Sequence, residues 1–167
     1  QDGTLPPGAK LTQPDTLKKR VCFMFTGQGS QRAGMGRGLY DAYPVFKACF
    51  DEIAALFDRE LDRSLKTLIF AEPDSEEAAL LNQTAYAQPA LFTLEVSLYK
   101  LWVSLGVVPD LVVGHSIGEL GAAHVAGVFG LEDACRLVAA RGRLMQALPE
   151  GGAMASIALS EEAVMAK

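Results

Sequence analysis

The residues best suited to chemistry lie in the stretch 111–119, which reads Leu-Val-Val-Gly-His-Ser-Ile-Gly-Glu. Three apolar residues of strand character lead into Gly-x-Ser-x-Gly, with Ser116 between Gly114 and Gly118, and a helical pattern follows. Strand, sharp turn, serine and helix in this order are typical of a nucleophile elbow, whose glycines let the backbone pack closely. Because a helix N-terminus offers unpaired N–H groups, Ser116 would stand where a developing oxyanion is stabilised.

The same serine has a second, purely structural interpretation. Ser116 and Glu119 match Ser-x-x-Glu, the capping box that starts many helices. In that case the hydroxyl would bond the first backbone N–H groups of the helix and would not be reactive. The segment alone leaves both interpretations open.

The loop after the first apolar run is a second candidate for function. Residues 21–25 have strand character, and the loop 26–31 reads Thr-Gly-Gln-Gly-Ser-Gln. Ligands of open α/β sheets bind at this carboxyl end of a strand. Arg32 stands where a dinucleotide-binding fingerprint needs its third glycine, and no Gly-Lys-Ser/Thr of a P-loop follows. Two interpretations remain: Gln28 supplies an amide beside the serine, or the loop is a simple turn.

Arg141 lies on the apolar stripe of a helix predicted at 131–147. It follows Leu137 by four residues and precedes Leu144 by three, so its guanidinium should face the interior or a cleft. A desolvated cation is costly unless it is paired, and a guanidinium can bind a carboxylate through two parallel hydrogen bonds. Arg141 is therefore a candidate receptor for a substrate carboxylate. The alternatives are a salt bridge, for example with Glu119, or a side chain that reaches solvent.

The chain has two histidines, and neither is well placed as a base for the serine. His115 precedes Ser116 directly, so the two side chains should diverge. His124 lies about two turns further along the following helix. Because a serine without a base is a poor nucleophile, a serine enzyme would need a further histidine.

Composition narrows the class of protein. The chain has 167 residues, enough for one domain, and its net charge of −5 argues against nucleic acid as a partner. Cys22, Cys49 and Cys135 are odd in number and widely spaced, which favours buried thiols in a reducing compartment over disulfides or a metal site. We find neither a signal peptide nor an uncharged apolar run of about 18 residues, so we expect a cytoplasmic protein without a membrane partner.

Hydrophobic periodicity predicts strands that alternate with helices. The predicted strands lie at 21–25, 111–113 and 153–159. The predicted helices lie at 45–58, 65–70, 88–105, 117–126 and 131–147, with another that begins at 160–162, and loops fill the rest of 63–83. Continuous apolar strands joined by helices indicate a parallel sheet, covered on both faces, in an α/β fold.

Six motifs in this order resemble the acyltransferase family that loads acyl carrier proteins from coenzyme A thioesters. They are Phe-Thr-Gly-Gln-Gly-Ser-Gln (25–31), Gly-Met-Gly (34–36), Ala-Gln-Pro-Ala-Leu-Phe (87–92), Gly-His-Ser-Ile-Gly-Glu (114–119), Ala-Ala-Arg-Gly (139–142) and Gly-Gly-Ala-Met (151–154). The family includes malonyl-CoA transacylases and the acyltransferase domains of fatty-acid and polyketide synthases. The polar, proline-containing leader resembles an interdomain linker, which favours a polyketide synthase domain over a free-standing transacylase.

The resemblance implies an α/β-hydrolase-like core with a small ferredoxin-like subdomain. Residues 1–20 would be an interdomain linker, 21–150 the N-terminal part of the large subdomain, and 151–167 the start of the small one. Family members are longer, and their catalytic histidine follows the small subdomain. We therefore expect this chain to be truncated, to lack the base, and to be inactive when alone.

The resemblance also assigns roles to individual residues. Ser116 would be the nucleophile, and the backbone of Gln28 and Ile117 would line the oxyanion hole. Arg141 would bind the free carboxylate of a malonyl-type acyl group. Further candidates for the substrate pocket are Gln88 and His115, and the residue types at 86–88 and 117 resemble malonyl-type rather than methylmalonyl-type domains.

The implied reaction has two steps and uses no metal or bound cofactor. The serine takes the acyl group from coenzyme A as an ester, and the phosphopantetheine thiol of an acyl carrier protein then removes it. The expected partners are malonyl-CoA, the carrier protein, neighbouring synthase domains and the missing part of the same domain. Two alternatives stay open: a serine esterase or thioesterase, and an inactive half-domain that docks a carrier protein.

Overall fold

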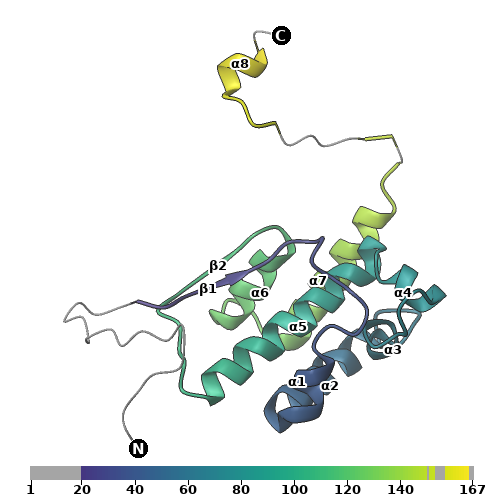
Figure 1. Cartoon of the computed structure of the whole chain (residues 1–167), viewed down its shortest axis with the longest axis vertical. Helices are drawn as coiled ribbons and strands as arrows, with labels where there is room; N and C mark the ends of the chain where they lie inside the picture. Colours follow the sequence, from purple (N-terminus) through teal and green to yellow (C-terminus); the bar gives the residue numbers. More distant parts are fainter. Residues whose placement is uncertain (1–19, 150, 153–156, 166–167) are drawn as a thin grey trace, which may run out of the picture.

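In the computed structural model of the chain, residues 20–149, 151–152 and 157–165 are described. A parallel sheet pairs β1 (Cys22–Phe25) with β2 (Leu111–Gly114), in a register that places Cys22 opposite Leu111 and Phe25 opposite Gly114. Parallel neighbours need a crossover connection, and here five helices provide it. Figure 1 shows the two strands side by side along one flank of a helical layer.

The described residues form eight helices, numbered here in chain order. They are α1 (Arg37–Ala42), α2 (Pro44–Phe57), α3 (Leu65–Ile69), α4 (Glu76–Leu80), α5 (Thr84–Ser104), α6 (Ile117–Val125), α7 (Leu131–Gln146) and α8 (Glu161–Met165). The long helix α5 lies at the centre and contacts α2, α6 and α7 (Figure 1). None of the described helices has the length and apolar character needed to cross a membrane.

The core lies between α2, α5 and α7, which we call the helical layer. The three-to-four spacing predicted on α2 is confirmed, because that helix buries Phe46, Phe50, Ile53 and Phe57 completely. The helix begins at Pro44, one residue before the predicted start, because proline is well suited to the first helical position, where its missing N–H costs nothing. Facing these residues, α5 buries Phe92, whose ring meets the edge of Phe57 at a centroid distance of 5.9 Å.

The start of α5 differs from the prediction. It begins at Thr84 rather than at residue 88, so Pro89 lies inside the helix. The leucine spacing that predicted this helix starts only at Leu91, and a proline inside a helix removes one backbone hydrogen bond. The residues before the proline, Tyr86, Ala87 and Gln88, are nevertheless buried, so tertiary packing outweighs the local cost.

Two short helices lie where the sequence predicted no regular structure. α4 carries a signal that could have been used: Ser75 accepts a hydrogen bond from the Ala78 N–H, and Glu76 and Glu77 occupy the first turn. α1 has no such signal, because Gly36 precedes it with φ +77° and no side chain caps it.

The predicted third strand is wrong where it can be compared with the structure. Residues 157–159 form an irregular bend with Ile157 and Leu159 half exposed, and no described strand pairs with them. Residues 153–156 and the predicted linker 1–19 lie outside the described residues. The helix predicted to start at 160–162 is confirmed as α8.

The sheet is not covered on both faces by the described residues, contrary to the expectation. Met24, Leu111 and Val113 are 80%, 56% and 48% exposed. The opposite face is covered, because Phe25 is buried and Phe23 packs its ring edge-on against Tyr99 of α5. The continuous apolar pattern could not distinguish one covered face from two.

Candidate active site

Ser116 lies in the sharp turn between β2 and α6. Its backbone has φ +56° and ψ −115°, a left-handed region that residues with a side chain rarely adopt. Backbone strain of this kind persists where the surrounding structure imposes it, and it is concentrated at functional sites. The side chain is exposed, so the turn presents the hydroxyl to solvent.

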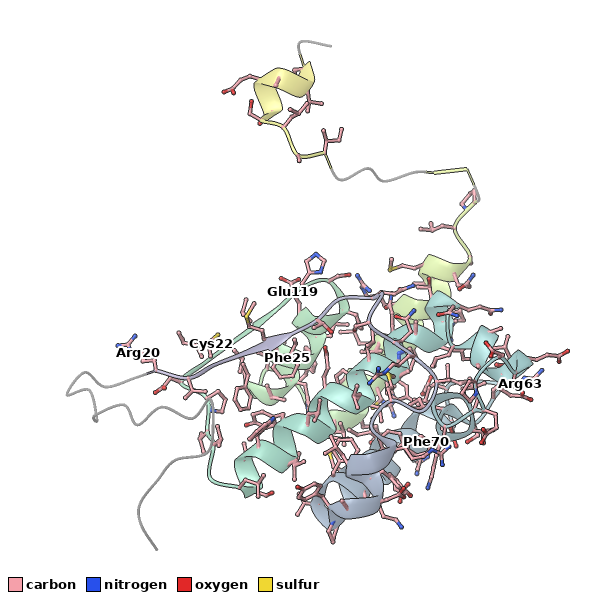
Figure 2. The ribbon with its side chains drawn as sticks, in the orientation of Figure 1. Arg20, Cys22, Phe25, Arg63, Phe70 and Glu119 are labelled. Atoms are coloured by element: carbon pink, nitrogen blue, oxygen red, sulfur yellow. The ribbon has the colours of Figure 1, made fainter. Side chains whose placement is uncertain are left out.

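The two flanking glycines are required by close backbone contacts, as predicted. A Cβ on Gly114 would lie 2.3 Å from the backbone of Gly118 and Glu119, and one on Gly118 would lie 2.3 Å from the Phe25 carbonyl oxygen. The start of α6 therefore packs directly on the end of β1. Figure 2 shows Phe25 and Glu119 at this same end of the sheet.

The capping-box interpretation of Ser116 is wrong. The serine side chain makes no hydrogen bond to the first backbone N–H groups of α6. Its Oγ instead accepts a hydrogen bond from Nη2 of Arg141, at 3.1 Å. Two residues that lie 25 positions apart, on α7 and in the β2–α6 turn, thus meet in the structure.

One guanidinium nitrogen of Arg141, Nη1, is buried beside the serine and has no hydrogen-bond partner among the described residues. The ion pairs of these residues do not include Arg141, so the alternative of a salt bridge with Glu119 is not supported. Because buried donors are nearly always satisfied, the unpaired Nη1 leaves a donor that could bind an acceptor group such as a carboxylate.

The loop 26–31 lies beside the Ser116 turn. A Cβ on Gly27 would lie 2.6 Å from Nδ1 of His115, and the His115 N–H bonds the Phe25 carbonyl at 3.0 Å. The backbone N–H groups of Gln28 and Ile117 have no acceptor among the described residues. Two free backbone N–H groups on adjoining segments could together form an oxyanion hole.

Gln28 is also held through its side chain, together with the predicted pocket residue Gln88. Gln28 Nε2 donates to Thr84 Oγ1 at 3.1 Å, and Gln88 Nε2 approaches Gln28 Oε1 at 3.5 Å and the Met145 sulfur at 3.3 Å. Gln88 is 1% exposed, and its Oε1 has no partner in the described part of the chain. This cluster joins the loop to α5 and α7.

Glu95 is a residue of the site that sequence reasoning missed. Its Oε1 accepts hydrogen bonds from the Thr26 N–H at 2.6 Å and from Thr26 Oγ1 at 2.8 Å. Burial raises the pKa of the Glu95 carboxyl, although the hydrogen bonds from Thr26 act in the opposite direction. The available signal was a carboxylate in the apolar centre of the predicted helix 88–105.

Neither histidine bonds to the serine. His115 is exposed at the turn, and His124 is half-buried on α6, where its Nδ1 lies 3.1 Å from the Phe129 carbonyl and its ring packs on Phe92. The only hydrogen-bond partner of Ser116 Oγ among the described residues is Arg141.

Comparison with known proteins identifies the family. The family model of the acyl transferase domain matches residues 22–167, so the chain belongs to this family. The chain is 52% identical over 150 residues to the PKS-NRPS hybrid synthetase ATPKS of Aspergillus niger, which covers 90% of this chain and 8% of that protein.

Solved structures agree with the α/β fold class. The acyltransferase domain from the second module of the salinomycin polyketide synthase is 57% identical, with a TM-score of 0.80 over 90% of this chain and 34% of that chain. PlMCAT:AntF, a type II PKS acyl-carrier protein in complex with its malonyl-transacylase, is 38% identical, with a TM-score of 0.67 over 80% of this chain and 41% of that chain. The chain thus spans about a third of the salinomycin domain and less than a tenth of the curated synthetase.

Proposed function

We propose that this chain supplies the nucleophile and the carboxylate receptor of a polyketide synthase acyltransferase domain. The domain would move a malonyl-type acyl group from coenzyme A to the phosphopantetheine thiol of an acyl carrier protein. The observation that carries the proposal is the contact of Arg141 Nη2 with Ser116 Oγ at 3.1 Å, beside an Nη1 that is buried and unpaired in the described residues.

In the first step, Ser116 Oγ attacks the thioester carbonyl carbon. The carbonyl oxygen takes the negative charge, and the backbone N–H groups of Gln28 and Ile117 stabilise it. A general base takes the proton of the serine hydroxyl and gives it to the sulfur as the carbon–sulfur bond breaks, so coenzyme A leaves as the thiol and the acyl group remains as a serine ester. The positive φ of Ser116 supports a nucleophile elbow, because it holds the hydroxyl clear of α6.

Arg141 selects the acyl group in this proposal. Nη2 keeps the serine oxygen in place while Nη1 receives the free carboxylate of the malonyl group. A charge-assisted hydrogen bond in a partly desolvated site contributes more than one between neutral groups, so an acyl group without a carboxylate is disfavoured. Gln88 and His115 complete the walls of the pocket.

In the second step, the phosphopantetheine thiol attacks the acyl-serine ester, and Ser116 leaves with a proton. A carrier protein and neighbouring synthase domains are the partners that this step requires. The similarity to a malonyl-transacylase that was solved with its carrier protein supports this partner. Coenzyme A and phosphopantetheine are substrates here, so we propose no bound cofactor or metal.

The general base must come from outside the two histidines of this chain. His124 bonds to the Phe129 carbonyl, and His115 lies beside Gly27. We therefore expect the 167 residues alone to acylate poorly, and a base from other polypeptide to complete the site.

The experiment is acyl transfer measured in the native polypeptide that contains this chain. With malonyl-CoA and a carrier protein, we expect malonyl-carrier to form through an adduct on Ser116, and Ser116→Ala to abolish both. Release of free malonate with no carrier product would contradict the proposal and favour the esterase or thioesterase, which the relatives do not favour. Carrier binding without any adduct would favour the docking half-domain.

A further inference from the structure

Glu95 is an unusual residue for the partly buried interface between α5 and the end of β1. It lies on α5, next to the fully buried Val96, and its Oε2 is buried without a partner in the described part of the chain. No described lysine or arginine pairs with it. A half-buried carboxylate without a cation is costly, and such groups are concentrated at functional sites.

Both described hydrogen bonds of Glu95 go to one residue, Thr26. The carboxylate accepts from the Thr26 N–H at 2.6 Å and from its hydroxyl at 2.8 Å. Because the hydroxyl has one proton and gives it to the carboxylate, the 3.1 Å contact with Ser30 makes Ser30 the donor. Glu95 therefore fixes both the backbone and the side chain of Thr26.

Thr26 in turn is placed to set the geometry of the loop 26–31. It is the first residue after β1 and lies two positions before Gln28. Its carbonyl oxygen would be 2.5 Å from a Cβ on Gly118, so it packs on the first turn of α6. The contact with Ser30 ties the far end of the loop to the same residue. The direction of the free Gln28 N–H thus depends on Thr26.

We propose that Glu95 is a positioning residue, whose carboxylate fixes Thr26 and thereby orients the oxyanion-binding N–H of Gln28. This inference rests on the proposed function, because it concerns the acylation step at Ser116. Glu95 itself touches no reacting atom and acts through the loop.

The test compares Glu95→Ala and Glu95→Gln in the native polypeptide. A glutamine keeps an oxygen that can accept both Thr26 bonds, whereas alanine removes them. Removing one oxyanion donor costs about 10²–10³-fold in rate, so misorienting one should cost about tenfold or more. We expect Glu95→Ala to slow Ser116 acylation by that factor with KM for malonyl-CoA nearly unchanged, and Glu95→Gln to recover most of the rate.

Two further variants separate positioning from stability. Ser97→Ala removes a 2.7 Å hydrogen bond to the Thr93 carbonyl on the same helix, so it perturbs α5 without touching the loop and should keep the wild-type rate. Thr26→Val removes the hydroxyl bond and keeps the N–H bond, and it should lose a smaller part of the rate. If Glu95→Ala does not fold, the acylation rate of Thr26→Val tests the positioning role in its place.

The outcomes distinguish this inference from the proposed function. If the wild type acylates Ser116 and folded Glu95→Ala acylates equally fast, the positioning role is overturned and the proposed function stands. The same holds if Ser97→Ala slows acylation as much as Glu95→Ala, or if Glu95→Gln recovers nothing. If the wild type forms no acyl-serine, both proposals are overturned.

Discussion

The helical layer and the two-stranded sheet are packed very differently, although both are built from apolar residues. Phe46, Phe50 and Phe92 in the layer are completely buried, whereas Met24 and Leu111 in the sheet are more than half exposed. The Ser116 turn lies between them, with α6 packed on α5 and α7 on one side and on the strands on the other. The turn is thus held from both sides, and we expect the buried rings of the helical layer to contribute more to its stability than the exposed side chains of the sheet.

The largest expected contrast is in stability. Phe92→Ala should lower the free energy of unfolding by about 3–5 kcal/mol, because it leaves a cavity among closely packed rings. Met24→Ala, at an 80% exposed position in β1, should change it by less than about 0.5 kcal/mol. Urea unfolding of both variants measures the difference, and equal losses would mean that the sheet is as firmly packed as the layer.

Substitutions at the contact between α6 and β1, where the two regions meet, should lower the free energy of unfolding nearly as much. Gly118→Ala brings a Cβ to 2.3 Å from the Phe25 carbonyl oxygen, so α6 must move away from β1 at a cost of about 1–3 kcal/mol. The matched control is Gly38→Ala in α1, where no atom lies within 4 Å of the new Cβ and helix propensity favours alanine. A Gly118→Ala protein as stable as the control would refute the close contact.

The smallest expected effect is the pH dependence of the free energy of unfolding that results from the Glu95 carboxyl. Burial raises the pKa of its carboxyl, so the folded state keeps this proton to a higher pH than the unfolded state does. Its contribution to stability is therefore largest at low pH and falls as the pH rises from the ordinary value of 4.5 through the raised one. Glu95→Gln should flatten this decline in urea unfolding between pH 4 and pH 7, and an unchanged slope would contradict the assignment.

Sequence reasoning predicted the local geometry of the candidate site where residues carry local signals. Gly114 and Gly118 mark a tight turn around Ser116, and the register of Arg141 with an apolar stripe predicted that its guanidinium faces the interior or a cleft, where the structure has it beside Ser116. The strands and the long helices follow from continuous apolar runs and three-to-four spacing. These features depend on neighbours in the sequence, which is why they could be predicted.

What the sequence did not predict depends on contacts between distant segments. Glu95 and Thr26 are 69 positions apart, and nothing local joins them. The helix α5 remains regular on both sides of Pro89 because its first turn packs against α7. Gly142 of α7 allows this close approach to the backbone of Thr84 and Ala85. Residues 157–159 have strand-like side chains, but a strand also needs a partner, and no described strand provides one.

The measurement that tests the central claim most directly is the preference of Ser116 for malonyl-CoA over acetyl-CoA. In the native polypeptide, intact-protein mass spectrometry would follow both adducts in the wild type, in Arg141→Ala and in Arg136→Ala, which removes an exposed charge from the same helix. A hydrogen bond to a charged group contributes about 1.5–3 kcal/mol, so Arg141→Ala should reduce the preference for malonyl about 10–100-fold, while Arg136→Ala leaves it unchanged. An unchanged preference in Arg141→Ala would contradict the claim that Arg141 beside Ser116 is the carboxylate receptor.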